Sequence, residues 1–149
     1  MEVCTNIFRR NLLLDNDILF PVGLFHEDIL FMFLCSYYAK RVMYSNVPFY
    51  FYRMRNGSIM QSITSKNYMH KLFMAGRLQI FKEDHLIELC SWDSVIVALY
   101  FTGVRKSRIK NNSLYKKIRK NKKLDLYARL KMLLLPLYHL AAAEIEIEL

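Results

Sequence analysis

Residues 27–34, with the sequence Glu-Asp-Ile-Leu-Phe-Met-Phe-Leu, decide the fold that we expect for this chain. Two acids open the stretch, and six apolar residues follow without a break. Acidic side chains are favoured at a helix start because the helix dipole leaves partial positive charge there. A helix that is apolar all round is buried on most of its sides. We therefore predict a mostly buried helix from residue 28 to about residue 40, with Glu27 and Asp28 at its start.

The segments on either side of this helix are short. Residues 6–14 read as a helix that the cluster Asp15-Asn16-Asp17 ends, because these side chains compete with the helical backbone for hydrogen bonds. Residues 18–20 are a brief extended run before Pro21. Residues 41–44 and 49–52 are rich in strand formers and flank a turn that ends at Pro48. We predict a β-hairpin of two short strands beside the buried helix.

From about residue 65 the apolar pattern becomes helical. It predicts one helix ending near residue 81, a second over residues 86–102, and a third over residues 124–140 that Pro136 interrupts. Residues 144–149 alternate acid and aliphatic, as a strand does. The predicted fold class is α+β, mainly α: residues 1–62 form a mixed part with the hairpin, and residues 63–149 form a helical tail.

Composition and charge restrict the classes of protein. The 149 residues suffice for a compact domain, and 54% hydrophobic content excludes a disordered chain. Three cysteines far apart in apolar surroundings are typical of reduced, buried thiols. No apolar run reaches the roughly 18 residues of a membrane span, and the N-terminus has no signal-peptide pattern. We therefore expect a cytoplasmic protein.

Five motifs stand in a fixed order between residues 20 and 60. They are Phe20-Pro21-Val22-Gly23, His26-Glu27-Asp28, Ala39-Lys40-Arg41, the segment 48–55 (PFYFYRMR) and Gly57-Ser58-Ile59-Met60. In this order and spacing they resemble the acceptor-side, C-terminal part of family 2 (GT-A-type) nucleotide-sugar glycosyltransferases. The resemblance covers a little over a third of the chain, and the tail matches that family only in being helical.

The resemblance implies an inverting sugar transfer from a nucleotide-sugar donor to a saccharide or lipid-linked acceptor. Asp28 takes the place of the general base that removes the acceptor proton, with Glu27 beside it. His26, Arg53, Arg55 and Ser58 fall in the substrate-binding set, and the arginines would offset charge on the leaving diphosphate. Each has a plainer explanation: the acids cap a buried helix, the arginines lie on a solvated strand end, and His26 lies on the surface.

The chain departs from that family in one large respect. It shows no nucleotide-binding fold and no metal-binding Asp-x-Asp at a strand end. Asp15-Asn16-Asp17 follows a helix and lies too near the Glu-Asp pair, so we expect no metal site here. A divalent ion, Mg²⁺ or Mn²⁺, is expected only for a full-length parent that supplies the donor half. We predict an inactive isolated chain that self-associates, or makes chain contacts covering Phe20, Phe25 or Phe51.

The net charge of +9 leaves a second class of function open. Residues 103–123 contain ten Lys or Arg residues and no acid, and a leucine-rich segment follows them. No nucleic-acid motif accompanies these charges, so nucleic acid is not the expected partner. Peripheral contact of residues 105–138 with the inner face of a membrane is one use, and a solvated charge run beside a core helix is the other. The alternative function is therefore a non-catalytic helical module that binds a membrane surface or a partner protein through its basic tail.

Overall fold

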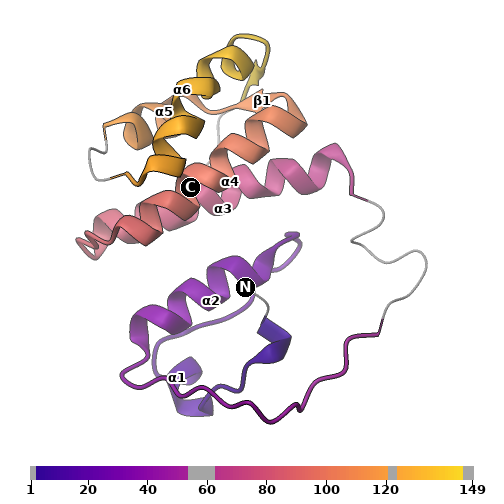
Figure 1. The fold of residues 1–149 in the computed structure, drawn as a ribbon, viewed down its shortest axis with the longest axis vertical. Helices are drawn as coiled ribbons and strands as arrows, with labels where there is room; N and C mark the ends of the chain where they lie inside the picture. The colour runs from indigo at the N-terminus through magenta and orange to yellow at the C-terminus, as the bar shows by residue number, and fades with distance from the viewer. Residues whose placement is uncertain (1–2, 54–62, 121–123, 146–149) are drawn as a thin grey trace. The chain divides into compact units, whose positions relative to one another are not determined.

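The computed structural model describes residues 3–53, 63–120 and 124–145. The chain divides into two compact units, Met1–Ser62 and Ile63–Leu149, called here the N-terminal and C-terminal units. Figure 1 shows the former in indigo to purple and the latter in pink to yellow. Helices make up most of the C-terminal unit and are the regular structure of the described N-terminal unit, and the described strands form one short sheet. The predicted class, α+β and mainly α, is confirmed.

The N-terminal unit is built on helix α2, Glu27–Tyr38, as the apolar run predicts. The 3-10 helix η1, Val3–Thr5, and the short helix α1, Arg10–Leu14, precede it. A small core joins these segments around three buried side chains, Ile18, Phe31 and Cys35. Six partly buried residues pack against that core: Val3, Phe8, Leu13, Met32, Leu34 and Tyr38.

The predicted β-hairpin is wrong for the described residues. Residues 39–53 contain no strand, and those after residue 53 that belong to the motif lie outside the described part of the chain. Every described side chain from residue 40 to residue 53 is exposed, including Val42 at 86% and Phe51 at 89%. An isolated two-stranded hairpin is marginal in water, and Pro48 has no N–H to donate to a ladder. Strand-forming residues alone therefore do not form a hairpin here.

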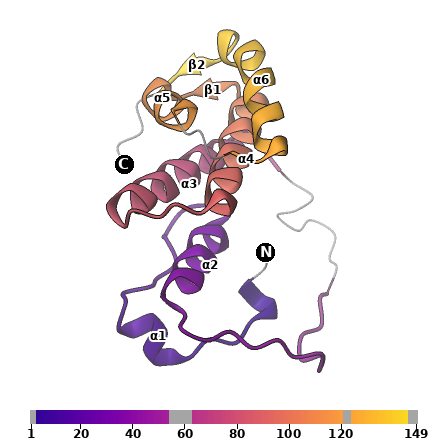
Figure 2. The ribbon, with the colours of Figure 1, turned by 60° about the vertical axis from the view of Figure 1, so that its left-hand side comes forward.

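The C-terminal unit is a helical assembly around two long antiparallel neighbours. Its elements are α3 (Ser65–Asp84), α4 (Cys90–Ser107), β1 (Ile109–Lys110), α5 (Asn112–Arg119), α6 (Leu126–Leu140) and β2 (Ala143–Glu144). Helix α4 packs along α3 on one side and against α6 on another, as Figures 1 and 2 show. Strands β1 and β2 pair in parallel, with Ile109 opposite Ala143. This places α4 at the centre of the unit.

Side-chain caps mark where α3, α5 and α6 of the C-terminal unit begin. The amide oxygen of Asn67 accepts hydrogen bonds from the backbone N–H and the hydroxyl of Thr64 at the start of α3. The side chain of Asn111 accepts from the N–H of Leu114 at 2.7 Å and begins α5 within the basic stretch. Asp125 accepts from the N–H of Ala128 at 2.7 Å and begins α6. Such caps satisfy donors that a helix start leaves open.

Helices α1 and α3 end in the same type of turn, although neither has a glycine there. At the end of α3, the N–H of Ile87 donates to the carbonyl of Lys82 and that of Leu86 donates to Glu83. Leu86 adopts the left-handed conformation, with φ of 51°. These are the two bonds of a Schellman motif, whose left-handed position favours glycine. The turn explains why α4 begins at Cys90 and not at the predicted residue 86.

Gly103 lets α3 and α4 approach each other closely. A Cβ atom at this position would lie 2.6 Å from Cδ2 of Leu72 and 3.2 Å from the carbonyl oxygen of Tyr68. Leu72 is fully buried, so its side chain has little room to move away. The missing side chain of Gly103 is therefore a condition of this helix packing.

None of the described helices combines the length and the apolar character that crossing a lipid bilayer requires.

We expect Gly103→Ala to destabilise the protein by about 1–2 kcal/mol. Overpacking a core costs about 1–3 kcal/mol, and the gain in helix propensity returns up to about 1 kcal/mol. Urea unfolding followed by circular dichroism measures the difference. Leu72→Ala supplies the matched background, because it removes the atoms that the new methyl group would meet. If Gly103→Ala costs as much in that background as in the wild type, the steric explanation is wrong.

We expect Leu86→Gly to stabilise the protein by about 0.5–1 kcal/mol. A left-handed conformation costs a non-glycine residue about 1–2 kcal/mol, which glycine avoids. Part of this gain is offset because glycine makes the unfolded chain more flexible. Leu86 is 86% exposed, so its removal leaves no cavity. Leu89→Gly is the control, since Leu89 is also exposed but has an ordinary φ of −94°. Equal losses of stability from both variants, measured by thermal unfolding, would contradict the account.

Candidate functional site

The first turn of helix α2 holds the acidic pair that the sequence singles out. Glu27 and Asp28 are its first two residues, and both are half-buried. His26 precedes them in the left-handed conformation, with φ of 65°, and its carbonyl accepts a hydrogen bond from the N–H of Ile29 at 3.1 Å. The Nε2 atom of His26 is shielded from solvent. Three titratable side chains are thus concentrated at one helix start.

A left-handed histidine at this point is unusual. A positive φ costs a non-glycine residue free energy, and such strain persists only where the surrounding structure enforces it. His26 does not cap the helix through its side chain, so its conformation is not explained by capping. The strained residue therefore orients the chain entering α2 directly before the two carboxylates.

Aromatic rings pack against helix α2 in the core of the N-terminal unit. The Phe31 ring, one turn along α2, stacks on that of Phe20 with 4.1 Å between centroids, and Phe8 meets it edge-on at 5.3 Å. Burial raises the pKa of the Cys35 thiol, which lies in the same core. Phe25, directly before His26, is half-buried. Glu27 and Asp28 thus begin a helix whose inner side is aromatic and apolar.

The remaining predicted site residues are not brought to this helix start by any described contact. Arg53 is exposed at the end of a described segment without regular structure. Arg55 and Ser58 lie outside the described residues. Their role at a diphosphate stays a prediction.

The segment Asp15-Asn16-Asp17 forms the turn that ends helix α1. Asp17 is left-handed with φ of 50°, and the N–H groups of Asp17 and Ile18 donate to the carbonyls of Leu14 and Leu13. The amide of Asn16 donates to the carbonyl of Leu12 at 2.9 Å. These bonds form a second Schellman turn, which ends α1. Among the described residues, no three His, Cys, Asp or Glu side chains gather closely enough to hold a metal ion.

The C-terminal unit contains a polar cluster that the sequence did not indicate. The hydroxyl of Tyr100 on α4 donates to the carbonyl of Asn111 at 2.8 Å and lies 3.0 Å from Nε2 of His139 on α6. Because one hydroxyl proton serves one acceptor, His139 donates from Nε2 to the Tyr100 oxygen in this arrangement. The His139 ring also packs on that of Tyr115, with 4.4 Å between centroids. His139, which looks ordinary in the sequence, thus links α4, α5 and α6.

Burial disfavours the ionised forms of His139 and Tyr100, and a nearby positive charge adds to this effect at His139. Burial lowers the pKa of His139, and the nearby Lys110 lowers it further against the opposing effect of Glu144. Burial raises the pKa of the Tyr100 hydroxyl, which therefore stays protonated at any physiological pH. The ammonium group of Lys110 donates to the carbonyl of His139 at 3.1 Å. The cluster is therefore a hydrogen-bonded brace whose neutral form is favoured.

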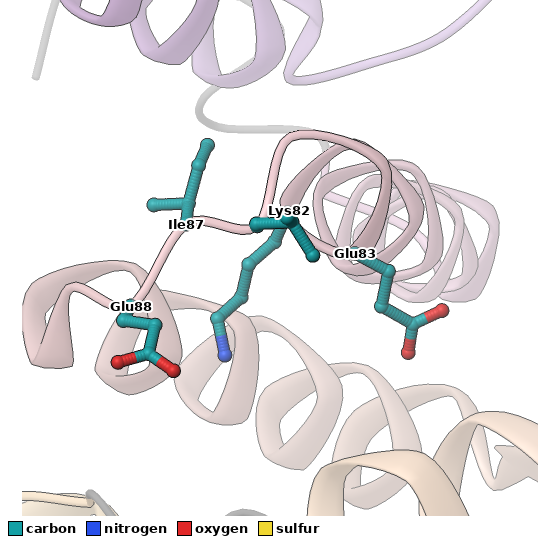
Figure 3. A pocket seen from close by; sticks show the side chains of 5 residues that line it. Lys82, Glu83, Ile87 and Glu88 are labelled. Carbon is teal, nitrogen blue, oxygen red and sulfur yellow. The ribbon is translucent and has the colours of Figure 1, made fainter.

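A shallow depression of about 290 Å³ lies at the turn between α3 and α4 (Figure 3). Figure 3 shows the side chain of Glu83 turned away from those of Lys82 and Glu88, the other polar lining residues. Lys82 bonds Asp93 on α4, which is 3% exposed, at 2.5 Å. Burial disfavours ionisation of Glu83, but bonds from Lys117 and Gln79 outweigh it and lower the pKa of Glu83 below its ordinary value. These contacts already hold Lys82 and Glu83. The depression is therefore part of a turn that ion pairs and hydrogen bonds stabilise.

The thiols differ from expectation in part. Cys35 is buried as predicted, whereas Cys4 and Cys90 are exposed, and all three are free. Both exposed thiols lie at or beside a helix start, in the 3-10 helix η1 and at the first residue of α4.

Comparison with known proteins finds no matching family model, no matching curated protein and no matching solved structure.

We expect the stability of the protein to fall as the pH is lowered from 7.5 to 5.5. Burial lowers the pKa of both His139 and His70 below the ordinary value of 6.5. The unfolded chain therefore binds protons before the folded protein does, and the free energy of unfolding declines as the pH falls through 6.5. Thermal unfolding across this range measures the effect.

His139→Gln separates the contribution of the brace. Glutamine keeps a polar group for the Tyr100 hydroxyl but does not titrate, so the pH dependence should become shallower. His85→Gln is the control at an exposed histidine. If His139→Gln leaves the slope between pH 7.5 and 5.5 unchanged, His139 does not carry it.

Proposed function

We propose that residues 1–62 are the acceptor-side part of an inverting nucleotide-sugar glycosyltransferase, with Asp28 as the general base. The observation that supports this most is the half-buried Glu27-Asp28 pair directly after the strained His26. Backbone strain of this kind clusters at functional sites. A plain helix cap would need only an acid and no left-handed residue before it.

The chemistry assigned to Asp28 is a single proton transfer coupled to substitution. The Asp28 carboxylate takes the proton of an acceptor hydroxyl as that oxygen attacks the anomeric carbon of the donor. A new carbon–oxygen bond forms on one face of the sugar. The bond from the anomeric carbon to the nucleoside diphosphate breaks on the opposite face, and its electron pair leaves with the phosphate oxygen. Glu27 places a second carboxyl group beside the base, and both side chains are half-buried.

In our proposal, residues 1–62 do not include the part of the enzyme that binds the nucleotide-sugar donor. We place no metal site at Asp15-Asn16-Asp17, which forms the turn that ends α1 through its backbone and its Asn16 side chain. A divalent ion would belong to a nucleotide-binding portion of the parent enzyme. Arg53 would meet the leaving diphosphate from the acceptor side, with Arg55 and Ser58 following it.

The exposed apolar residues of the N-terminal unit support such a missing neighbour. Eight large side chains between residues 42 and 52 are 43–90% exposed: Val42, Met43, Tyr44, Val47, Phe49, Tyr50, Phe51 and Tyr52. Monomeric proteins rarely expose apolar residues in such a concentration. We propose that this segment packs against the nucleotide-binding portion, or against another copy of the chain when that portion is missing. The proposed location is the cytoplasm, where nucleotide-sugar donors are available.

Activity in a chain that carries the nucleotide-binding portion tests the proposal. We expect Asp28→Asn to lower kcat by about 10²–10⁴-fold, the usual contribution of a positioned base. Donor affinity, measured by calorimetry, should change little, because the base acts on the acceptor proton in the transition state. Arg53→Ala should instead weaken both donor affinity and turnover.

Asp15→Asn is the matched control, because it makes the same chemical change in the same unit at the end of α1. It should leave transfer near the wild-type rate. If Asp28→Asn also retains near-normal turnover, Asp28 is only the acid at a helix start, and the catalytic assignment fails.

A further inference from the structure

Helix α6 carries two opposite leucine-containing stripes, and only one of them is used for packing. Ala128 and Leu135 are fully buried in the unit, and Met132 and His139 beside them are half-buried. These four positions are spaced i, i+4, i+7 and i+11, so they form one face. This inner face packs against α4.

The outward side of α6 is also apolar. Its leucines are 50–85% exposed: Leu126, Leu130, Leu133, Leu134, Leu137 and Leu140. We call these six residues the leucine face. Four of them repeat the spacing i, i+4, i+7, i+11 with an offset of two residues, or about 200°, from the inner stripe. A surface helix normally puts polar residues on this side, so the leucine face needs a partner.

The charged groups within α6 are cationic, and the acid Asp125 lies at its N-cap. Helix α6 contains no acid between Leu126 and Leu140 and carries two bases, Arg129 and Lys131. The ammonium group of Lys131 lies 3.9 Å from the centroid of the Tyr127 ring and 6.0 Å from that of Phe101. Arg105, at the end of α4, lies 5.9 Å from the same Phe101 ring. Basic groups from two helices thus converge beside one edge of α6.

We propose that the leucine face lies on an anionic membrane surface, with α6 parallel to it. Leucines would enter the boundary between headgroups and acyl chains, and Lys131 and Arg105 would contact lipid phosphates. Tyr127 and Tyr138 beside the face have the amphipathic character that favours this depth. Fifteen residues are too few to cross a bilayer, so the helix lies in the surface.

A second copy of the chain fits this face less well than a membrane does. Packing two leucine faces together would bring Lys131 and Arg105 of both copies near each other, and Asp125 at the N-cap of α6 offsets only part of this charge. Like charges brought together oppose association, whereas anionic headgroups neutralise the same groups. The inference does not depend on the glycosyltransferase proposal, because it rests only on residues of the C-terminal unit.

Cosedimentation of the full chain with vesicles tests the proposal. We expect binding to vesicles of phosphatidylcholine containing phosphatidylglycerol, weaker binding to pure phosphatidylcholine, and a decline with added salt. The double variant Leu133→Gln with Leu137→Gln should lower the partition coefficient by about tenfold or more. Leu86→Gln with Leu89→Gln is the matched control, because it removes two exposed leucines elsewhere in the same unit. It should bind as the wild type does.

The electrostatic part has its own variant. Arg105→Gln with Lys131→Gln should reduce binding to anionic vesicles and flatten its dependence on salt, while binding to neutral vesicles stays unchanged. Far-UV circular dichroism verifies that each variant is folded.

A fluorescent residue on α6 gives an independent readout. Native Trp92 is 5% exposed, so its emission should respond little to lipid. Leu133→Trp should shift to shorter wavelength with anionic vesicles, and Leu86→Trp should not. The proposal is overturned if the wild type does not bind anionic vesicles, or if Leu133→Gln with Leu137→Gln binds them undiminished. It is also overturned if that variant only converts a dimer to a monomer in sedimentation, which would assign the face to a second copy.

Discussion

The close approach of α3 and α4 at Gly103 is the constraint on which the C-terminal unit depends. With no side chain on Gly103, Leu72 sits directly against the backbone of α4. The same central helix supplies Tyr100 to the brace with Asn111 and His139, and Asp93 to the ion pair with Lys82. A larger residue at 103 would move α4 as a whole, because packed helices shift as rigid elements. The polar contacts therefore rest on an apolar one.

Buried polar groups give this unit its specificity. Asp93 and Tyr100 are almost fully buried on α4, and each is matched by a partner from another helix. An unmatched buried charge or hydroxyl costs more than a bond returns, so these pairs penalise any other arrangement of the helices. The apolar core alone tolerates several packings of similar volume. In this protein the polar pairs select one of them.

The surplus of apolar residues is explained by two separate surfaces. One is the exposed aromatic segment of residues 42–52 in the N-terminal unit, and the other is the leucine face of α6. Their chemistry differs. The first is rich in Tyr and Phe and has the character of a protein contact, since such residues are enriched at interfaces. The second is almost purely leucine with basic groups at its edge, which suits lipid. The overall hydrophobic content of 54% does not distinguish these two kinds of surface.

The acidic pair and most of the longer helices could be predicted from consecutive residues alone. The apolar run after Glu27 and Asp28 fixed α2 almost to the residue, since local periodicity and dipole preference are properties of consecutive residues. The sequence also predicted the three longer helices of the tail, although the start of α4 was placed four residues early because Leu86 occupies a turn position normally taken by glycine. Helix α5 was missed within the basic stretch, where only its cap Asn111 and two buried residues, Leu114 and Ile118, mark it.

Only the tertiary structure decided the strands and the role of His139. Residues 41–52 have strand-forming side chains, yet strand pairing needs a neighbour that supplies hydrogen bonds and buries one face. The strands seen in the described part of the chain, β1 and β2, pair residues 34 positions apart, which no local pattern reveals. His139 likewise meets Tyr100 across 39 residues. Contacts of this separation depend on how helices pack, and packing is set by the shapes of side chains that are distant in sequence.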